Sequence, residues 1–296
     1  MKIRLLSTVS ALAAAILVGL VFRRLDITKQ TQYRSWTRQR VAAKASPIQS
    51  GLENGIRRRM ALAEGLVTYV SIRPDLNQKE FEAFARMLIA GDTVVAGVNL
   101  ARNNAISHVQ PLAGNEKAIG FEILQDDVQR GPAEKAIVTR KPVIAGPVKL
   151  VQGGFSFIGR LPVFLPPKKA GENETYWGLA AVLIKQDGLF REAGLPADSG
   201  VVRYALRGKD GRGAKGGVFF GKEDLFKSRP VLLDMALPNG SWQMAAVPAG
   251  GWLKTAPGSW KFRTFGVLVS IVIGVLVFFF IEGWFPRSGT KLVKAG

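Results

Sequence analysis

Two uninterrupted apolar segments, residues 5–22 and 265–281, constrain this chain more than any other feature, because neither carries an ionised side chain. A helix rises about 1.5 Å per residue, so roughly 17 to 20 apolar residues approach the ~30 Å hydrocarbon core of a membrane. The sequence between the two segments is mixed in polarity. We therefore expect two membrane-spanning helices that bracket one soluble region.

The first apolar segment has an alternative interpretation as a cleaved signal peptide, because Lys2 and Arg4 precede a short apolar run as in a secretory leader. Phe22 is followed directly by Arg23 and Arg24, and no pair of small residues marks a cleavage site there. We expect the segment to be retained as an anchor.

Charges next to the two segments do not decide their orientation. Lysine and arginine accumulate on the cytoplasmic side of membrane helices. Here, however, both flanks of both segments are basic: Lys2, Arg4, Arg23, Arg24, Lys261, Arg263, Arg287, Lys291 and Lys294. A soluble region between two spans must nevertheless lie wholly on one side of the membrane.

The chain carries 41 basic and 22 acidic residues, a formal net charge of +19. Such an excess favours nucleic acid, anionic lipid or acidic proteins as partners. The basic residues are spread along the sequence without a nucleic-acid-binding motif, so we expect no nucleic-acid partner and retain anionic lipid. Because the chain has no cysteine, disulfides and cysteine-ligated metals are excluded.

Residues 26–90 show the spacing of amphipathic helices. Pro47, Gly51 and Gly55 are expected to weaken or kink the first helix, and Pro74 to end it. Asn77 and Glu80 form the pattern of a capping box that opens a second helix over residues 78–90. Apolar residues of the first helix recur every three, four or seven positions: Ile48, Leu52, Ile56, Ala63, Val67 and Val70.

Beyond residue 93 the pattern changes to short β-type runs separated by turn residues. One helical interval, residues 126–139, interrupts them. We predict two consecutive antiparallel sheets. The predicted strands cover residues 94–100, 119–123, 143–151, 155–164 and 176–184, then 201–207, 217–220, 231–237 and 241–246.

Several motifs of this region together resemble the CHASE domain. The resemblance extends over roughly residues 45–253, and its most specific part is the block from Ala145 to Phe164. The motifs are Ser71-Ile72-Arg73-Pro74, Pro111-Leu112-x-Gly114-Asn115, Ala145-Gly146-Pro147, Leu150-Val151-Gln152-Gly153-Gly154-x-Ser156-Phe157, Arg160-x-Pro162-Val163-Phe164, Tyr176-Trp177-Gly178-Leu179, Leu237-Pro238-x-Gly240-Ser241-Trp242 and Pro248-x-Gly250-Gly251-Trp252.

This resemblance implies an α+β fold, with a long N-terminal stalk helix and two tandem PAS-like antiparallel sheets between two transmembrane helices. The expected parts are an anchor (1–24), a helical stalk (25–93), a membrane-distal PAS-like module (94–195), a membrane-proximal one (196–262) and a final span with a short tail (263–296). It also implies a bacterial inner-membrane protein with a periplasmic bulk and two cytoplasmic termini. The sequence departs from the plant cytokinin receptors of this family, so their specificity does not carry over.

Four polar residues in apolar runs are the candidate ligand-binding residues: Glu122, Gln152, Ser156 and Arg160. Arg160 lies in an apolar strand, where a cation needs an internal carboxylate or an anionic ligand as its partner. For each of the four, a buried structural hydrogen bond is the alternative. Gly153 and Gly154 are explained by a tight turn between strands.

No catalytic apparatus is visible in the sequence. His108 is the only histidine, which excludes a pair of histidine metal ligands, and we expect its role to be structural. Phosphate-binding loops, dinucleotide fingerprints and paired-carboxylate motifs are missing, so neither a metal, a cofactor nor an enzymatic activity is expected. Trp260 and Trp284, near the two ends of the second apolar segment, are expected at the membrane interfaces.

Two functions of different class remain open. Relatives usually continue into a kinase or cyclase, whereas only residues 282–296 follow the second apolar segment here. This favours a non-catalytic accessory or scaffold subunit of a respiratory, secretory or photosynthetic membrane complex, with a membrane protein as its partner. The alternative is a small-molecule sensor whose output domain is separate or has been removed.

Overall fold

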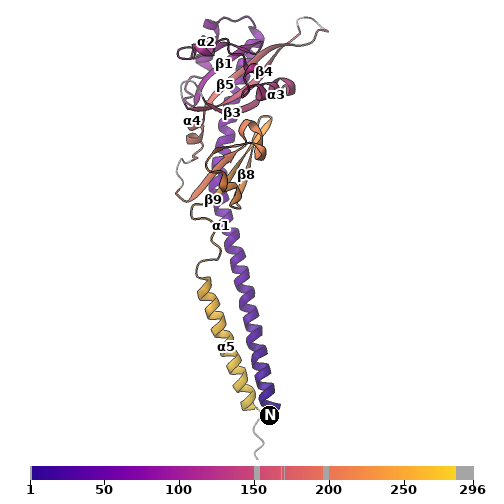
Figure 1. Cartoon of the computed structure of the whole chain (residues 1–296), viewed down its shortest axis with the longest axis vertical. Coiled ribbons are helices and arrows are strands. Elements are labelled where there is room, and N and C mark those ends of the chain that lie inside the picture. Colours follow the sequence, from indigo (N-terminus) through magenta and orange to yellow (C-terminus); the bar gives the residue numbers. More distant parts are fainter. Residues whose placement is uncertain (1, 150–153, 168, 170, 196–199, 285–296) are drawn as a thin grey trace, which may run out of the picture. The chain divides into compact units, whose positions relative to one another are not determined.

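The computed structural model describes residues 2–149, 154–167, 169, 171–195 and 200–284. Contacts divide the chain into two compact units, one formed by residues 1–39 with 252–296 and the other by residues 40–251. Figure 1 labels the α-helices and most of the strands. The α-helices are α1 (Lys2–Ile72), α2 (Gln78–Leu88), α3 (Arg130–Thr139), α4 (Gln186–Glu192) and α5 (Ser259–Trp284).

In the first unit, the N-terminal part of α1 pairs with α5 in antiparallel fashion. Phe22 packs against Phe262 with ring centroids 5.6 Å apart, and the Ser7 hydroxyl lies 3.5 Å from the Glu282 carboxylate. Small residues allow the backbones to approach: a Cβ on Gly274 would lie 3.2 Å from the Ala11 carbonyl oxygen. Both helices are long and apolar enough to cross a membrane by length and composition.

In the second unit, α1 buries the predicted apolar stripe, with Ile48, Leu52 and Ile56 nearly inaccessible. α1 continues through Pro47. Gly51 and Gly55 allow α4 and the residue after it to pack closely against α1, because a Cβ on Gly51 would come within 2.9 Å of the Ala193 backbone. The predicted capping box is confirmed at the start of α2.

A five-stranded antiparallel sheet follows, in the order β2-β1-β5-β4-β3. One of its faces packs on α1, as a Cβ on Gly159 would lie 2.3 Å from Sδ of Met60. The opposite face carries α3 and the 3-10 turns η1 (Glu116–Ala118) and η2 (Ile123–Gln125). The strands are β1 (Val95–Arg102), β2 (Ala105–Gln110), β3 (Val143–Lys149), β4 (Phe155–Leu165) and β5 (Thr175–Lys185).

One predicted strand of this sheet is wrong. Residues 119–123 end in the turn η2, with Gly120 at φ +85°. They lie against the start of β2 through backbone hydrogen bonds with Ile106 and Asn104 and through one isolated bridge, Glu122 with Ala105, and belong to no strand. The apolar character of the segment is explained by Ile123, which is buried against the sheet. β2 itself escaped prediction because Ser107 and His108 interrupt its apolar pattern.

The second sheet has four antiparallel strands in the order β7-β6-β9-β8. Its edge strand β8 is tied to α1, since Gln49 donates to the Asp234 carbonyl oxygen at 2.7 Å and the Ala236 amide donates to Glu53 at 2.9 Å. Turns η3 (Lys209–Gly211), η4 (Gly213–Lys215) and η5 (Glu223–Lys227) connect the strands. The strands are β6 (Val202–Arg207), β7 (Val218–Phe220), β8 (Val231–Leu237) and β9 (Gly240–Pro248).

Candidate functional site

Strand β4 separates packing residues from candidate binding residues by the alternation of its side chains. Phe157 packs against Trp242 of β9 with centroids 4.6 Å apart, and Gly159 faces α1. Ser156, Ile158 and Arg160 therefore lie on the other face of the sheet. On that face the sheet is only partly covered, and two cavities adjoin it.

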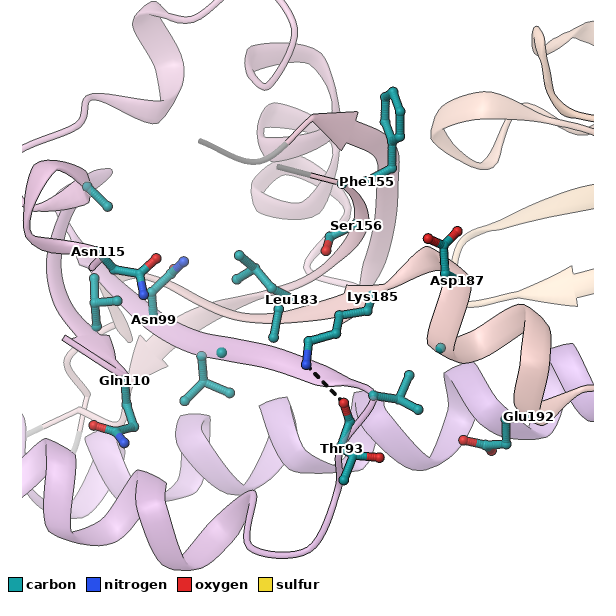
Figure 2. A pocket seen from close by; sticks show the side chains of 18 of the residues that line it. Thr93, Asn99, Gln110, Asn115, Phe155, Ser156, Leu183, Lys185, Asp187 and Glu192 are labelled. Carbon is teal, nitrogen blue, oxygen red and sulfur yellow. Dashed lines mark hydrogen bonds between the residues drawn. The ribbon is translucent and has the colours of Figure 1, made fainter. Parts of the chain in front are cut away.

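The larger cavity has a volume of about 820 Å³. Figure 2 shows Asn99 of β1 and Asn115 at one end of it and Asp187 and Glu192 of α4 towards the other. The Lys185 ammonium donates to the Thr93 carbonyl oxygen at 3.0 Å along its wall. Amides and charged groups thus surround a space large enough for a metabolite.

The smaller cavity, about 240 Å³, adjoins the larger one and is lined in part by Lys117 and Ala118 of η1 and by Gln129, the residue before α3. The two cavities share four of their lining residues: Asn99, Asn115, Ala118 and Leu183. Most of the remaining lining of the smaller cavity is apolar. Its charged groups are Arg160, Lys117 and Lys149, and its described lining residues include no aspartate or glutamate.

Arg160 is buried, with 2% of the residue exposed. Its guanidinium donates to the backbone oxygen of Gln129 at 3.4 Å and to the Gln129 side-chain oxygen, while its Nε has no partner among the described residues. Burial lowers the pKa of Arg160 to about 10, although Asp126 and Asp210 oppose this shift from a distance. In the described part of the chain, no carboxylate forms a salt bridge with Arg160.

The other predicted binding residues have different surroundings. Ser156 lines the larger cavity, is fully buried, and its hydroxyl has no hydrogen-bond partner within the described ranges. Glu122 is exposed at the start of η2 and lines neither cavity. Gln152 lies outside the described residues. The structure thus brings two of the four candidates, Ser156 and Arg160, to one face of the sheet.

The lining residues missed by the sequence analysis include three amides: Asn99, Asn115 and Gln129. Asn99 carried a usable signal, because it is an amide within an apolar strand. Asn115 precedes the turn η1, and Gln129 precedes α3. Polar side chains are common at such positions. Only the chain's path over the sheet brings them beside Arg160.

The α4 wall of the larger cavity is held to α1 by charge. Glu192, a lining residue, accepts hydrogen bonds from Arg58 and from Arg59, whose side chain is 3% exposed. Asp92, which precedes β1, also accepts from Arg59 at 2.8 Å. A change in the position of α4 therefore acts directly on α1.

His108 has the structural surroundings expected for it. Its Nε2 lies 3.1 Å from the Leu76 carbonyl oxygen and its Nδ1 lies 2.9 Å from the Ser107 hydroxyl. Because the carbonyl can only accept, Nε2 carries the proton and Nδ1 accepts from the serine. Trp260 and Trp284 are exposed near the two ends of α5, and their interfacial position stays a prediction.

Two antiparallel sheets, a long helix and cavities on one sheet face make this an α+β domain with space for a ligand. The CHASE domain family model matches residues 70–220, slightly more than half of the 296 residues, and the chain belongs to this family. A comparison with curated protein sequences finds no match.

Several solved structures are similar to this chain at low sequence identity. "Methyl-accepting Chemotaxis protein X" aligns with a TM-score of 0.50 and 14% identity over 73% of this chain and 99% of that one. The ligand-binding domain of the Pseudomonas aeruginosa PAO1 chemoreceptor PctC in complex with GABA gives 0.48 and 16% over 71% and 99%. An extracellular ligand-binding receptor from Desulfohalobium retbaense DSM5692 gives 0.47 and 15% over 71%, and this chain spans only 39% of its length.

The family match bears on the two functions left open by the sequence. It supports a ligand-sensing domain outside the cytoplasm. Neither the fold nor the comparisons support the accessory or scaffold role that the short tail had favoured.

Proposed function

We propose that this protein is a membrane-anchored, non-catalytic sensor that binds a small molecule outside the cytoplasm. The observation that carries the proposal is the pair of adjoining cavities on one face of the five-stranded sheet, within the residues matched by the CHASE family model. Two buried polar groups without partners among the described residues, the Ser156 hydroxyl and Arg160 Nε, belong to their lining.

The proposal includes the organisation expected from the sequence. Residues 1–24 and 263–296 hold the membrane anchors and residues 25–93 the stalk, while residues 94–195 and 196–262 each form a PAS-like module. The bulk of the chain lies in the periplasm and both termini lie in the cytoplasm. The two long apolar helices support this organisation.

A sensor must bind its ligand more tightly in one conformation than in another. Here the larger cavity is bordered by α4, and Glu192 joins α4 to the buried Arg59 of α1. A ligand that favours one position of α4 thereby favours one arrangement of its contact with α1. The signal would then pass from the binding module along α1.

The test is a thermal-shift screen of the full chain in detergent against metabolites of acidic, basic and neutral character. A ligand at a hundredfold excess over its Kd adds about 2.7 kcal/mol to the free energy of unfolding. We expect compounds that raise the Tm of the wild type. The variant Asn99→Trp should abolish these shifts because Asn99 lines both cavities.

Val138→Trp is the matched control, since Val138 is 81% exposed on α3 and lines neither cavity. It should respond like the wild type. Ala118→Trp, which also fills both cavities, replaces Asn99→Trp if that variant does not fold. Ligands that bind both filled variants normally, or a wild type stabilised by no compound, would contradict the proposal.

A further inference from the structure

The smaller cavity differs from the larger one in its charge. Its charged lining residues are Arg160, Lys117 and Lys149, whereas the larger cavity combines Lys185 and Arg191 with acidic residues of α4. The described lining of the smaller cavity provides no carboxylate to balance its cations. Its electrostatic potential therefore favours an anion.

Of the three cations that line the smaller cavity, Arg160 is the one whose charge is shielded from hydration. Lys117 and Lys149 are exposed, but Arg160 is 2% exposed. A buried charge without a counter-charge costs several kcal/mol even after relaxation. The backbone and side-chain oxygens of Gln129 accept hydrogen bonds from the guanidinium of Arg160. Because Gln129 is neutral, the positive charge of Arg160 remains unbalanced.

The two carboxylates that oppose the pKa shift of Arg160, Asp126 and Asp210, accept hydrogen bonds from backbone amides. Asp126 accepts from the backbone amides of Val128 and Gln129 at 3.1 and 2.8 Å. Asp210 accepts from the Gly146 amide at 2.7 Å. Neither forms a salt bridge with Arg160, so their influence on it is only long-range. Arg160 Nε remains available for an oxygen that the described residues do not supply.

The rest of the lining indicates what the anion carries. Apolar side chains surround the basic group: Ile106, Phe121, Ile123, Val148, Ile158 and Leu183. A volume of about 240 Å³ suits a short apolar body. Where the two cavities meet, the lining includes the amide of Asn99, which can contact a polar substituent. A carboxylate attached to an apolar group matches this lining better than an inorganic anion, which would leave the apolar walls without contacts.

We infer that the smaller cavity binds the carboxylate of a small organic acid, with Arg160 as its charge partner and the apolar wall around Ile158 holding its body. This inference rests on the proposed sensory function and names the chemical class of its ligand. A guanidinium is suited to the role because its donors match the oxygens of a carboxylate.

The experiment compares carboxylates with their neutral amides on the full chain in detergent. The probes are benzoate, 3-methylbutanoate and succinate, each paired with its amide, together with sulfate and inorganic phosphate. We expect at least one carboxylate to raise the Tm, and its amide to bind roughly tenfold or more weakly, because a hydrogen bond to a charged group contributes about 1.5–3 kcal/mol.

Arg160→Met should abolish the carboxylate response, and Arg160→Lys should retain part of it. Arg203→Met is the control, because Arg203 is an exposed strand residue of the other sheet. If Arg160→Met does not fold, two other results test the inference. They are the difference between carboxylate and amide on the wild type, and the carboxylate response of Arg160→Lys. Equal responses to acid and amide, a response to sulfate or phosphate alone, unchanged binding by the Arg160 variants, or no carboxylate response would overturn the inference.

The metabolite screen separates this failure from failure of the proposed function. Neutral or basic ligands that stabilise the wild type and are blocked by Asn99→Trp would leave the sensor intact and refute only the carboxylate. A wild type that responds to no compound of any charge refutes both proposals.

Discussion

Arg59 of α1 donates a 2.7 Å hydrogen bond to Oε2 of Glu192, the last residue of α4. Burial opposes the charge of Arg59, but its bonds to Glu192 and Asp92 outweigh this effect and raise the pKa of Arg59. Asp92 shows the same balance, and its pKa is lowered despite its own burial. The ion pair between Arg59 and Asp92 thus stabilises the charged form of each of these two residues.

Removing Arg59 should leave two acidic groups without their buried counter-charge. We expect Arg59→Met to lower the free energy of unfolding by about 3–5 kcal/mol, as for one lost partner of a buried pair. The full chain can be followed in detergent by chemical denaturation with circular dichroism.

Arg58 provides the matched control for Arg59, because it bonds the same Glu192 while its side chain is 66% exposed. Arg58→Met should cost less than about 1 kcal/mol. Comparable losses for the two variants would show that burial does not distinguish them.

Gly51 tests the close packing of α4 on α1. Replacing helical glycine by alanine favours folding by up to about 1 kcal/mol when the site is open. Gly51→Ala should instead destabilise the protein by about 1–3 kcal/mol, because the Cβ meets the Ala193 backbone at 2.9 Å. The measurement is again chemical denaturation, and a gain in stability for Gly51→Ala would refute the close packing of α4.

Protonation of His108 should destabilise the fold. Its pKa is lowered by burial, with a smaller contribution from Arg102 and an opposing one from the Leu76 carbonyl. The unfolded chain therefore takes up a proton at higher pH, near about 6.5, than the folded chain does. Stability should fall as the pH drops from about 6.5 towards the lowered folded-state value, by at most about 1.4 kcal/mol per pH unit.

The variant His108→Gln isolates this effect, because the chain contains no other histidine. Its stability should be flat over the same range above the titration of the carboxylates. Equal pH profiles for the variant and the wild type would contradict the assignment.

Membrane topology can be read with reporter fusions. A fusion after Phe22 and one before Lys261 should report the periplasm, and a fusion after Gly296 should report the cytoplasm. The expectation follows from two apolar segments on either side of one soluble region. A cytoplasmic signal from the central region would refute the proposed orientation.

Most helices and strands were predictable because each follows a local pattern. The stripe from Ile48 to Val70 and the capping box at Asn77 depend on neighbouring residues along one helix. β8 was predicted with its observed ends, Val231–Leu237. The short helix α4 was missed, because its seven residues show too little periodicity.

The candidate site was harder to predict because it depends on tertiary contacts. Arg160 was recognised as a charge in an apolar strand, but whether its partner was internal depended on where Asp126 and Asp210 lie. Glu122 looked equivalent in one dimension and is exposed in the fold. Gly51 and Gly55 looked like helix breakers, whereas the positions of Ala193 and Leu189 explain them as close contacts.

The alternation along β4 has an evolutionary consequence. Phe157 and Gly159 meet Trp242 and Met60, whereas Ser156, Ile158 and Arg160 line the cavities. On the proposed function, substitutions in the second group would alter which compound is accepted, while the first group keeps its contacts. Lineages carrying this fold could then diverge in ligand preference through neighbouring codons of one strand, without a matching round of compensatory mutations at Phe157 and Gly159.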